Sequence, residues 1–265
     1  MLGDITLGQY YPSQSSIHRL DPRGKLGATA LFMTLIFLAH GIAGYGIITG
    51  LLILGIILAR LPLRVILRGL KPILFIVAFT FLLNILFTQS GEVLVTLWFI
   101  RITQGGLISA VRLAVRLILL VVGTSLLTLT TTPIELTDGL ERVLKPLNWV
   151  RFPVHEMSMM MTIALRFIPT LAEEADRIMK AQAARGADFD TGGILQRAKG
   201  LIPLLVPLFV GAFRRADDLA TAMEARCYAG KEGRTSMKEY HLKLPDYLLL
   251  LLLSAIIAAV CIWGL

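Results

Sequence analysis

The stretch that decides the architecture runs from Leu171 to Gly186, LAEEADRIMKAQAARG, and it returns from Phe213 to Cys227 as FRRADDLATAMEARC. At an offset of 41 residues the copies share five identical residues, which are Ala175, Asp176, Ala181, Ala184 and Arg185 in the first copy. Both copies are rich in strong helix formers, so each predicts the C-terminal end of a helix. A chain that presents one helix end twice is expected to meet a partner that offers the same receptor twice.

The two copies end differently. Gly186 directly follows the first Ala-Arg, and glycine closes helices in the left-handed conformation. After the second Ala-Arg the chain reads Cys227-Tyr228-Ala229-Gly230, so we expect the break there to be delayed by a few positions.

The composition is that of an integral membrane protein. Of 265 residues, 55% are hydrophobic, and the mean hydropathy is +0.73. Between Thr131 and Leu244 lie 16 of the 26 basic residues and 14 of the 18 acidic residues, which predicts a water-exposed insert. We therefore read the net charge of +8 as a signal of membrane orientation, with the lipid bilayer and no nucleic acid as a partner. The two cysteines predict no disulfide framework, and the N-terminus does not read as a cleavable signal.

Five apolar segments predict transmembrane helices. They are Leu26 to Ala39, Ile42 to Ala59, Pro72 to Thr88, Leu107 to Leu129 and Tyr247 to Leu265. Basic residues cluster before the first segment and in the loop from Arg60 to Lys71, which places the N-terminus and the charged insert in the cytoplasm. The loop Gln89 to Gly106 then faces outward, and Val93 to Ile102 within it is expected to form a short strand.

The insert reads as three helices. Thr132-Pro133-Ile134-Glu135 is a capping box that opens a short amphipathic helix. Two long helices follow, His155 to Arg185 kinked at Pro169, and Ile194 to Arg226 bent by Pro203 and Pro207. The fold class is all-α membrane protein, divided into a membrane domain (1–130), a cytoplasmic coupling-helix domain (131–244) and a C-terminal transmembrane helix (245–265).

Arg112 and Arg116 lie one helical turn apart inside the fourth apolar segment. Two arginines at mid-membrane cost about 5 to 7 kcal/mol, which the surrounding apolar residues can offset. Two interpretations stay open: contact with a partner or substrate path, or snorkelling with an internal hydrogen-bonded role.

The sequence contains no phosphate-binding GxxxxGK[ST] loop, no HExxH, and no Cys or His cluster with metal-ligand spacing. We therefore predict no catalytic, cofactor-binding or metal-ligating residue, and no enzyme. A lone arginine at a helix end usually only complements the helix dipole. Because the pattern around Arg185 and Arg226 is duplicated, we interpret both as docking points for a partner with two similar lobes that hydrolyses ATP, such as an ABC-type nucleotide-binding dimer.

The chain resembles the T component (EcfT, the transmembrane scaffold subunit) of energy-coupling factor transporters for vitamins and metals. The resemblance is carried by residues 18–25 (HRLDPRGK), 132–136 (TPIEL), 165–169 (LRFIP), 181–186 (AQAARG) and 222–226 (AMEAR). Two departures stand out: Cys227 is where the family has glycine or another small residue, and Gly24 is where it usually has threonine.

The resemblance implies a non-catalytic scaffold in the bacterial plasma membrane. ATPase docking would fall on Ala184, Arg185 and Gly186 and on Ala225, Arg226 and Cys227. Its partners would be two ABC-type ATPase subunits, with a heterodimer favoured, and a membrane-embedded substrate-binding S component. ATP and Mg would bind the ATPases and no cofactor would bind this chain.

Two other classes of membrane protein fit the sequence less well. A self-contained secondary transporter or channel needs ionisable groups at mid-membrane and symmetric broken helices, and only Arg112 and Arg116 come near that requirement. A membrane-bound enzyme lacks its catalytic groups. The transported substrate, and whether the S component is dedicated or shared, stay open.

Overall fold

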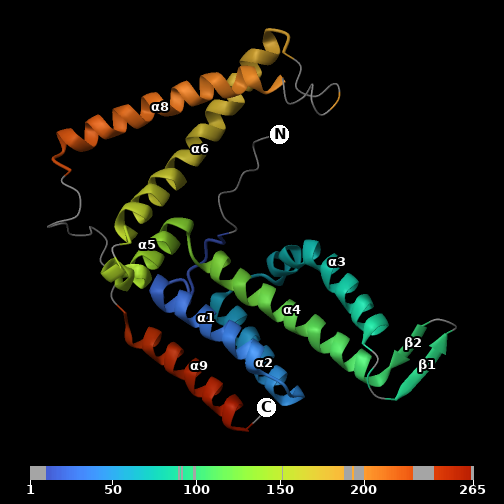
Figure 1. Ribbon diagram of the computed structural model, residues 1–265. Helices are drawn as coiled ribbons and strands as arrows, with labels where there is room; N and C mark the ends of the chain where they lie inside the picture. The colour runs from blue at the N-terminus through green and yellow to red at the C-terminus, as the bar shows by residue number, and fades with distance from the viewer. Residues whose placement is uncertain are drawn as a thin grey trace. The chain divides into compact units, whose positions relative to one another are not determined.

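The computed structural model describes residues 10–88, 90, 92–97, 100–150, 152–187, 193, 200–228 and 242–263 (Figure 1). The chain divides into two compact units, one made of residues 8–143 and 240–265 and the other of residues 1–7 and 144–239. We call them the membrane unit and the coupling unit and describe each by itself.

The membrane unit holds six helices and a β-hairpin among its described residues. The helices are α1 (Pro22–Leu38), α2 (Ile42–Ala59), α3 (Leu63–Phe87), α4 (Gln104–Thr130), α5 (Pro133–Leu144) and α9 (Leu244–Trp263). The hairpin is β1 (Val93–Leu97) and β2 (Ile100–Thr103), paired antiparallel. The predicted external strand is therefore two short strands, and the all-α fold class is confirmed apart from this hairpin.

Four of the described helices, α2, α3, α4 and α9, are long and apolar enough to cross a membrane. The first predicted span became α1, whose 17 residues fall short of the about 20 that a bilayer requires. By length and composition, the described helices therefore supply four candidate spans in place of the five that the sequence predicted. The helix α1 packs between α9 and α4, as Figure 1 shows.

The core of the membrane unit is formed by α1, α2 and α4 together with α9. Leu35, Ile36 and Ile48 are completely buried there. Large apolar side chains also stay exposed on the outer faces of α2, α3 and α9, among them Ile57, Phe75 and Leu251. An apolar core with an equally apolar exterior is the arrangement expected of helices surrounded by lipid.

The third span begins earlier than predicted. Arg60 ends α2 in the left-handed conformation at φ 53°, and α3 starts three residues later at Leu63. The basic residues after Arg60, assigned to a loop from their sequence, therefore lie inside the first turns of α3, and Pro72 lies within the helix. Their near-helical spacing was the signal that the helix had already begun.

A polar junction joins the start of α1 to the start of α9. The Asp21 side chain caps α1 by accepting from Arg23 N at 2.9 Å. Asp246 is buried and accepts from Asp21 N at 3.0 Å and from Lys243 N at 2.8 Å. A β-carbon at Gly24 would lie 3.0 Å from Asp246 Oδ1, so glycine at this position permits the close approach of the two helices.

The predicted capping box of α5 is confirmed. Glu135 N donates to Thr132 Oγ1 at 3.3 Å, and Thr132 N donates to the Glu135 carboxylate at 3.5 Å. Pro133 is the first residue of the helix. A β-carbon at Gly139 would lie 2.9 Å from Pro22, so α5 packs on the start of α1 and falls within the membrane unit, although its sequence was grouped with the long helices.

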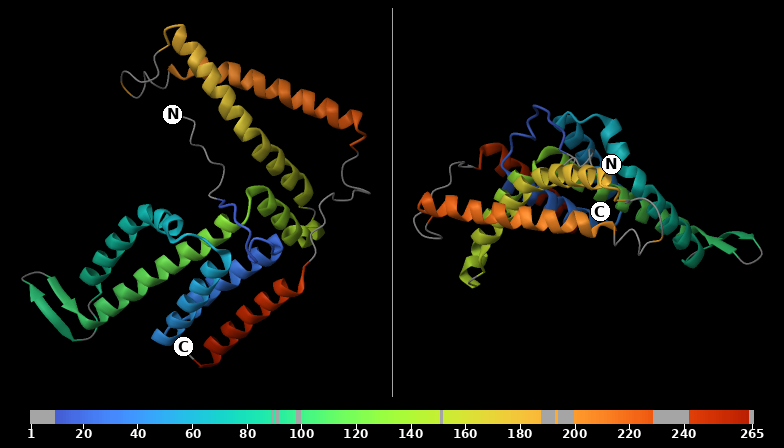
Figure 2. Two further views of the ribbon diagram at one scale, coloured as in Figure 1. Left: turned by 180° about the vertical axis from the view of Figure 1, so that it is seen from behind. Right: turned by 90° about the horizontal axis from the view of Figure 1, so that it is seen from above.

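The coupling unit holds the 3₁₀ helix η1 (Lys145–Val150) and the long helices α6 (Val154–Ala184) and α8 (Ile202–Ala225) among its described residues. Figure 2 shows α6 and α8 from two further sides. Both predicted long helices are present, with Pro169 inside α6 and Pro207 inside α8. Pro203 lies in the first turn of α8, where a missing N–H costs nothing, so it does not bend the helix interior. The predicted start at Ile194 lies outside the described residues.

Candidate functional site

The first predicted docking motif forms the C-terminal end of α6. The helix ends at Ala184, Arg185 takes φ −89° and ψ 6°, and Gly186 adopts the left-handed conformation at φ 88°. Gly186 N donates to Ala183 O at 3.0 Å, and Ala187 N donates to Gln182 O at 3.0 Å. These two bonds define a Schellman motif, which satisfies the last carbonyl groups of a helix.

The second predicted motif forms the end of α8 with the same backbone. Arg226 takes φ −92° and ψ 16°, and Cys227 is left-handed at φ 56°. Cys227 N donates to Glu224 O at 2.9 Å, and Tyr228 N donates to Met223 O at 3.0 Å. Both bonds repeat those of α6 at an offset of 41 residues. The expected delay of the break is wrong, because Cys227 itself takes the position that glycine holds in the first copy.

The left-handed positions differ in their cost. A β-carbon at Gly186 would meet no atom within 4 Å, so only the backbone conformation requires glycine there. At Cys227 the same conformation costs roughly 1 to 2 kcal/mol, because a β-carbon crowds the following carbonyl oxygen. The second end therefore keeps the geometry of the first in spite of its residue type.

All six residues of the two motifs are exposed. Each arginine thus presents a charged, planar group of five donors beside an alanine that allows close approach by another surface. The two motifs do not form one site. Tyr228 Oη lies 3.0 Å from the Met159 sulfur, so the end of α8 lies near the N-terminal half of α6, whereas Arg185 is at the opposite end of α6.

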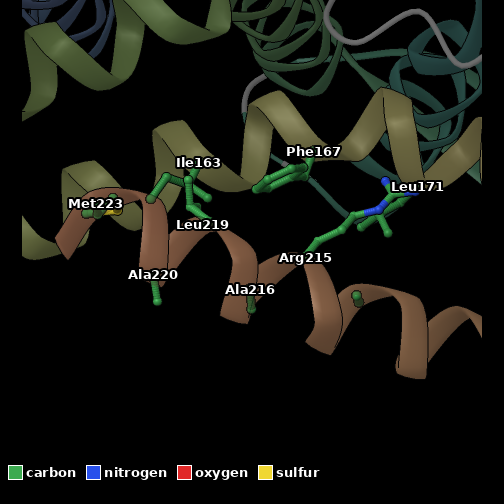
Figure 3. Close-up of a pocket in the computed structure, with 9 residues that line it drawn as sticks. Ile163, Phe167, Leu171, Arg215, Ala216, Leu219, Ala220 and Met223 are labelled. Atoms are coloured by element: carbon green, nitrogen blue, oxygen red, sulfur yellow. The ribbon is translucent and has the colours of Figure 1, made fainter. Parts of the chain in front are cut away.

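The two helices pack through an apolar seam with a cavity of about 250 Å³. Figure 3 shows Ile163, Phe167 and Leu171 of α6 facing Leu219 and Met223 of α8. At one end of this seam Arg215 of α8 forms an ion pair with Glu174 of α6. Sequence reasoning missed this pair, although the two residues occupy equivalent positions of the repeat and the 41-residue offset connects them.

Arg116 of α4 is bound within the membrane unit. Its Nε donates to Tyr45 Oη of α2 at 3.1 Å, and its guanidinium lies 5.8 Å from the centre of the Phe37 ring of α1. The internal hydrogen-bonded interpretation therefore holds for Arg116. Arg112, one turn earlier, is exposed.

Among the described residues, no three His, Cys, Asp or Glu side chains lie close enough together to hold a metal ion. The cofactor and metal assignments of the sequence analysis stay predictions.

The sequence is similar to known transporter components along nearly its whole length. Residues 13–237 match the CbiQ family, described as cobalt transport protein. A relative from Acidaminococcus fermentans, named energy-coupling factor transporter transmembrane protein EcfT, is 51% identical over 100% of this chain and 99% of its own length. Relatives of the same name from Thermosediminibacter oceani and Bacillus subtilis are 54% and 50% identical, over 92% and 90% of this chain and 91% and 90% of their own lengths. With four described helices long and apolar enough to cross a membrane, and with this degree of identity, the chain belongs to the EcfT family, the transmembrane components of energy-coupling factor transporters.

Proposed function

We propose that this protein is the non-catalytic scaffold that couples two ABC-type ATPase subunits to a membrane-embedded substrate-binding S component, for uptake of vitamins or other micronutrients. The observation that carries the proposal is the duplicated helix end. Two exposed arginines, Arg185 and Arg226, follow helices whose last hydrogen bonds match one for one. Two exposed arginines in the same backbone setting suit a partner with two similar lobes.

The arginine tips are suited to a protein partner. An exposed guanidinium binds a carboxylate through two parallel hydrogen bonds and also donates to backbone carbonyl groups. The left-handed residue after each arginine turns the chain away from the helix axis, so that the arginine becomes the last side chain of its helix. Closure of a two-lobed ATPase would then move the C-terminal ends of α6 and α8.

The orientation is part of the proposal. The basic residues before α1 and at the start of α3 favour the cytoplasmic side, which places the N-terminus and the coupling unit in the cytoplasm with the ATPases. The hairpin between α3 and α4 would then face outward.

The test is the double charge reversal Arg185→Glu with Arg226→Glu. We expect it to abolish co-purification of the ATPase subunits and to abolish uptake, while the protein still inserts into the membrane. The matched control is Lys180→Glu with Arg214→Glu, which changes the charge equally at exposed positions of the same helices outside the two motifs. The ion pair of Lys180 with Asp176 is exposed, so its loss should have only a small effect on stability.

Normal uptake by the Arg185→Glu, Arg226→Glu variant would refute docking at the tips. Uptake by the purified chain alone, without any ATPase, would favour a self-contained secondary transporter or channel instead.

A further inference from the structure

The ion pair between Glu174 and Arg215 joins the two halves of the repeat to each other. Arg215 follows Glu174 by 41 residues, which is the offset that superposes the two helix ends. A residue that contacts its own repeat equivalent lies on the approximate two-fold axis that relates the copies. The pair therefore marks that axis within the coupling unit.

The charges at the axis depend on divergence of the repeat. If both copies carried Glu, or both carried Arg, two like charges would meet between α6 and α8 and repel each other. With Glu174 and Arg215 the same contact is attractive, and it is only partly exposed, at 26% and 33% of the two side chains. Gly211 admits the carboxylate, since a β-carbon there would lie 3.0 Å from Glu174 Oε1.

The axis divides the coupling unit into arms of equal length. Arg185 follows Glu174 by eleven positions, and Arg226 follows Arg215 by the same number. At 1.5 Å per residue each tip lies roughly 16 Å from the pair along its helix. Because α6 and α8 run in opposite directions at their contact, the two tips point away from each other.

The contact joins the two helices at a single point, so the angle between them is sensitive to the charges of the pair. Arg215 donates to Glu174 through Nη2, and in the part of the chain that the structure describes its buried Nη1 has no hydrogen-bond partner. A bidentate contact would fix the angle between the helices more strictly. A rotation of about 20°, the ordinary scatter of helix crossing angles, would move a tip by roughly 6 Å at this arm length.

We propose that Glu174 and Arg215 are positioning residues that set the angle between α6 and α8, and with it the spacing of the two arginine tips. The proposal rests on the proposed function in one respect: the two-fold axis of the docked ATPase pair then passes through this ion pair.

The first measurement needs no partner. Spin labels on cysteines introduced at Lys180 and Thr221, exposed and equivalent in the repeat, report the distance between the arms by pulsed electron paramagnetic resonance. The labelled full-length chain carries Cys227→Gly and Cys261→Ser, so that no other thiol reacts. Glu174→Arg should shift or broaden the distance distribution by several ångströms, and Glu174→Arg with Arg215→Glu should restore it.

The second measurement is co-purification of the ATPases with the same Glu174 and Arg215 variants in the chain with native cysteines. Glu174→Arg should lose binding at least tenfold, and the charge-swapped double variant should recover it. Recovery in the double variant would show that the loss comes from the charges of this pair and not from the Glu174→Arg side chain alone.

The outcomes separate the two ideas. An unchanged distance distribution in Glu174→Arg, or no recovery of that distribution in the double variant, overturns the positioning role. If the distance distribution changes in Glu174→Arg and recovers in the double variant while ATPase binding stays constant, the positioning role stands and docking at both tips fails.

Discussion

At the scale of single residues, the left-handed positions after the two arginines give a paired prediction. Gly186→Ala should weaken the end of α6, and Cys227→Gly should strengthen the end of α8, each by about 1 kcal/mol, because only glycine adopts positive φ without a steric penalty. Hydrogen exchange of the Ala187 and Tyr228 amides, which close the two Schellman motifs, should speed up and slow down respectively by about fivefold.

Glu224→Gly is the control for these substitutions. It lies in the last turn of α8 and has helical backbone angles, so glycine there should weaken the helix. Faster or unchanged exchange at Tyr228 in Cys227→Gly would show that the left-handed conformation does not strain this residue.

Residue-level chemistry explains what the sequence revealed of the site and what it did not. The duplicated Ala-Arg is a pattern of neighbouring residues, and such a pattern can be recognised from the sequence alone. The conformation of Cys227 is not local in this sense, because cysteine carries no left-handed preference and only the closing hydrogen bonds impose it. The contact of Glu174 with Arg215 required knowing that two helices run in opposite directions, which no single helix encodes.

At the scale of elements, the segment before α1 is hydrogen-bonded to the ends of two other helices. Tyr11 N donates to Leu129 O at the end of α4 at 3.0 Å, and Ser13 Oγ donates to Ala59 O at the end of α2 at 3.1 Å. His18 holds this segment in place, with Nε2 at 3.0 Å from Tyr11 O and Nδ1 at 2.6 Å from Ser15 Oγ. Because a carbonyl only accepts, Nε2 carries the proton and Nδ1 accepts from the serine.

The hydrogen bonds that hold this segment through His18 should weaken in acid. Burial, the largest effect, lowers the pKa of His18 below its ordinary value of 6.5. The unfolded chain therefore binds a proton more readily than the folded one, and stability is complete above pH 6.5 and falls as the pH drops through the lowered value. The melting temperature of the purified protein should therefore decrease as the pH is lowered from 7.5 to about 5.5.

His18→Gln is the matched variant, because its amide nitrogen replaces the Nε2 donor and does not titrate. Its melting temperature should change less over the same pH interval. An equal decrease in both proteins would assign the acid sensitivity to other groups.

The elements also show where sequence patterns are sufficient. Long apolar runs predicted α2, α4 and α9 within a few residues, since the bilayer itself demands that length. The pattern failed at the start of α3, where charged side chains project from a helix that has already begun. The sequence predicted a helix there, but the start of α3 depended on where α2 ends. Arg60 ends α2 in the left-handed conformation, which composition does not signal.

At the scale of the whole molecule, two tips on one unit predict avidity. When one tip is bound, the second meets its lobe at a high effective concentration, so that joint binding exceeds either single contact by a hundredfold or more, on the order of 10² to 10⁴. Arg185→Glu alone and Arg226→Glu alone should therefore each lower the affinity for the ATPase pair by roughly that factor. Titration of the purified single variants with the ATPase pair should show this loss of affinity for each of them.

The single variants distinguish two handles from one. Because the arms are of equal length and the last hydrogen bonds of the two helices match, both variants should be impaired to a comparable degree, and neither as severely as the double reversal. If one single variant behaved like the native chain and the other like the double reversal, only one tip would carry the partner. The duplication would then be a remnant of the repeat, and coupling through two symmetric levers would have to be abandoned.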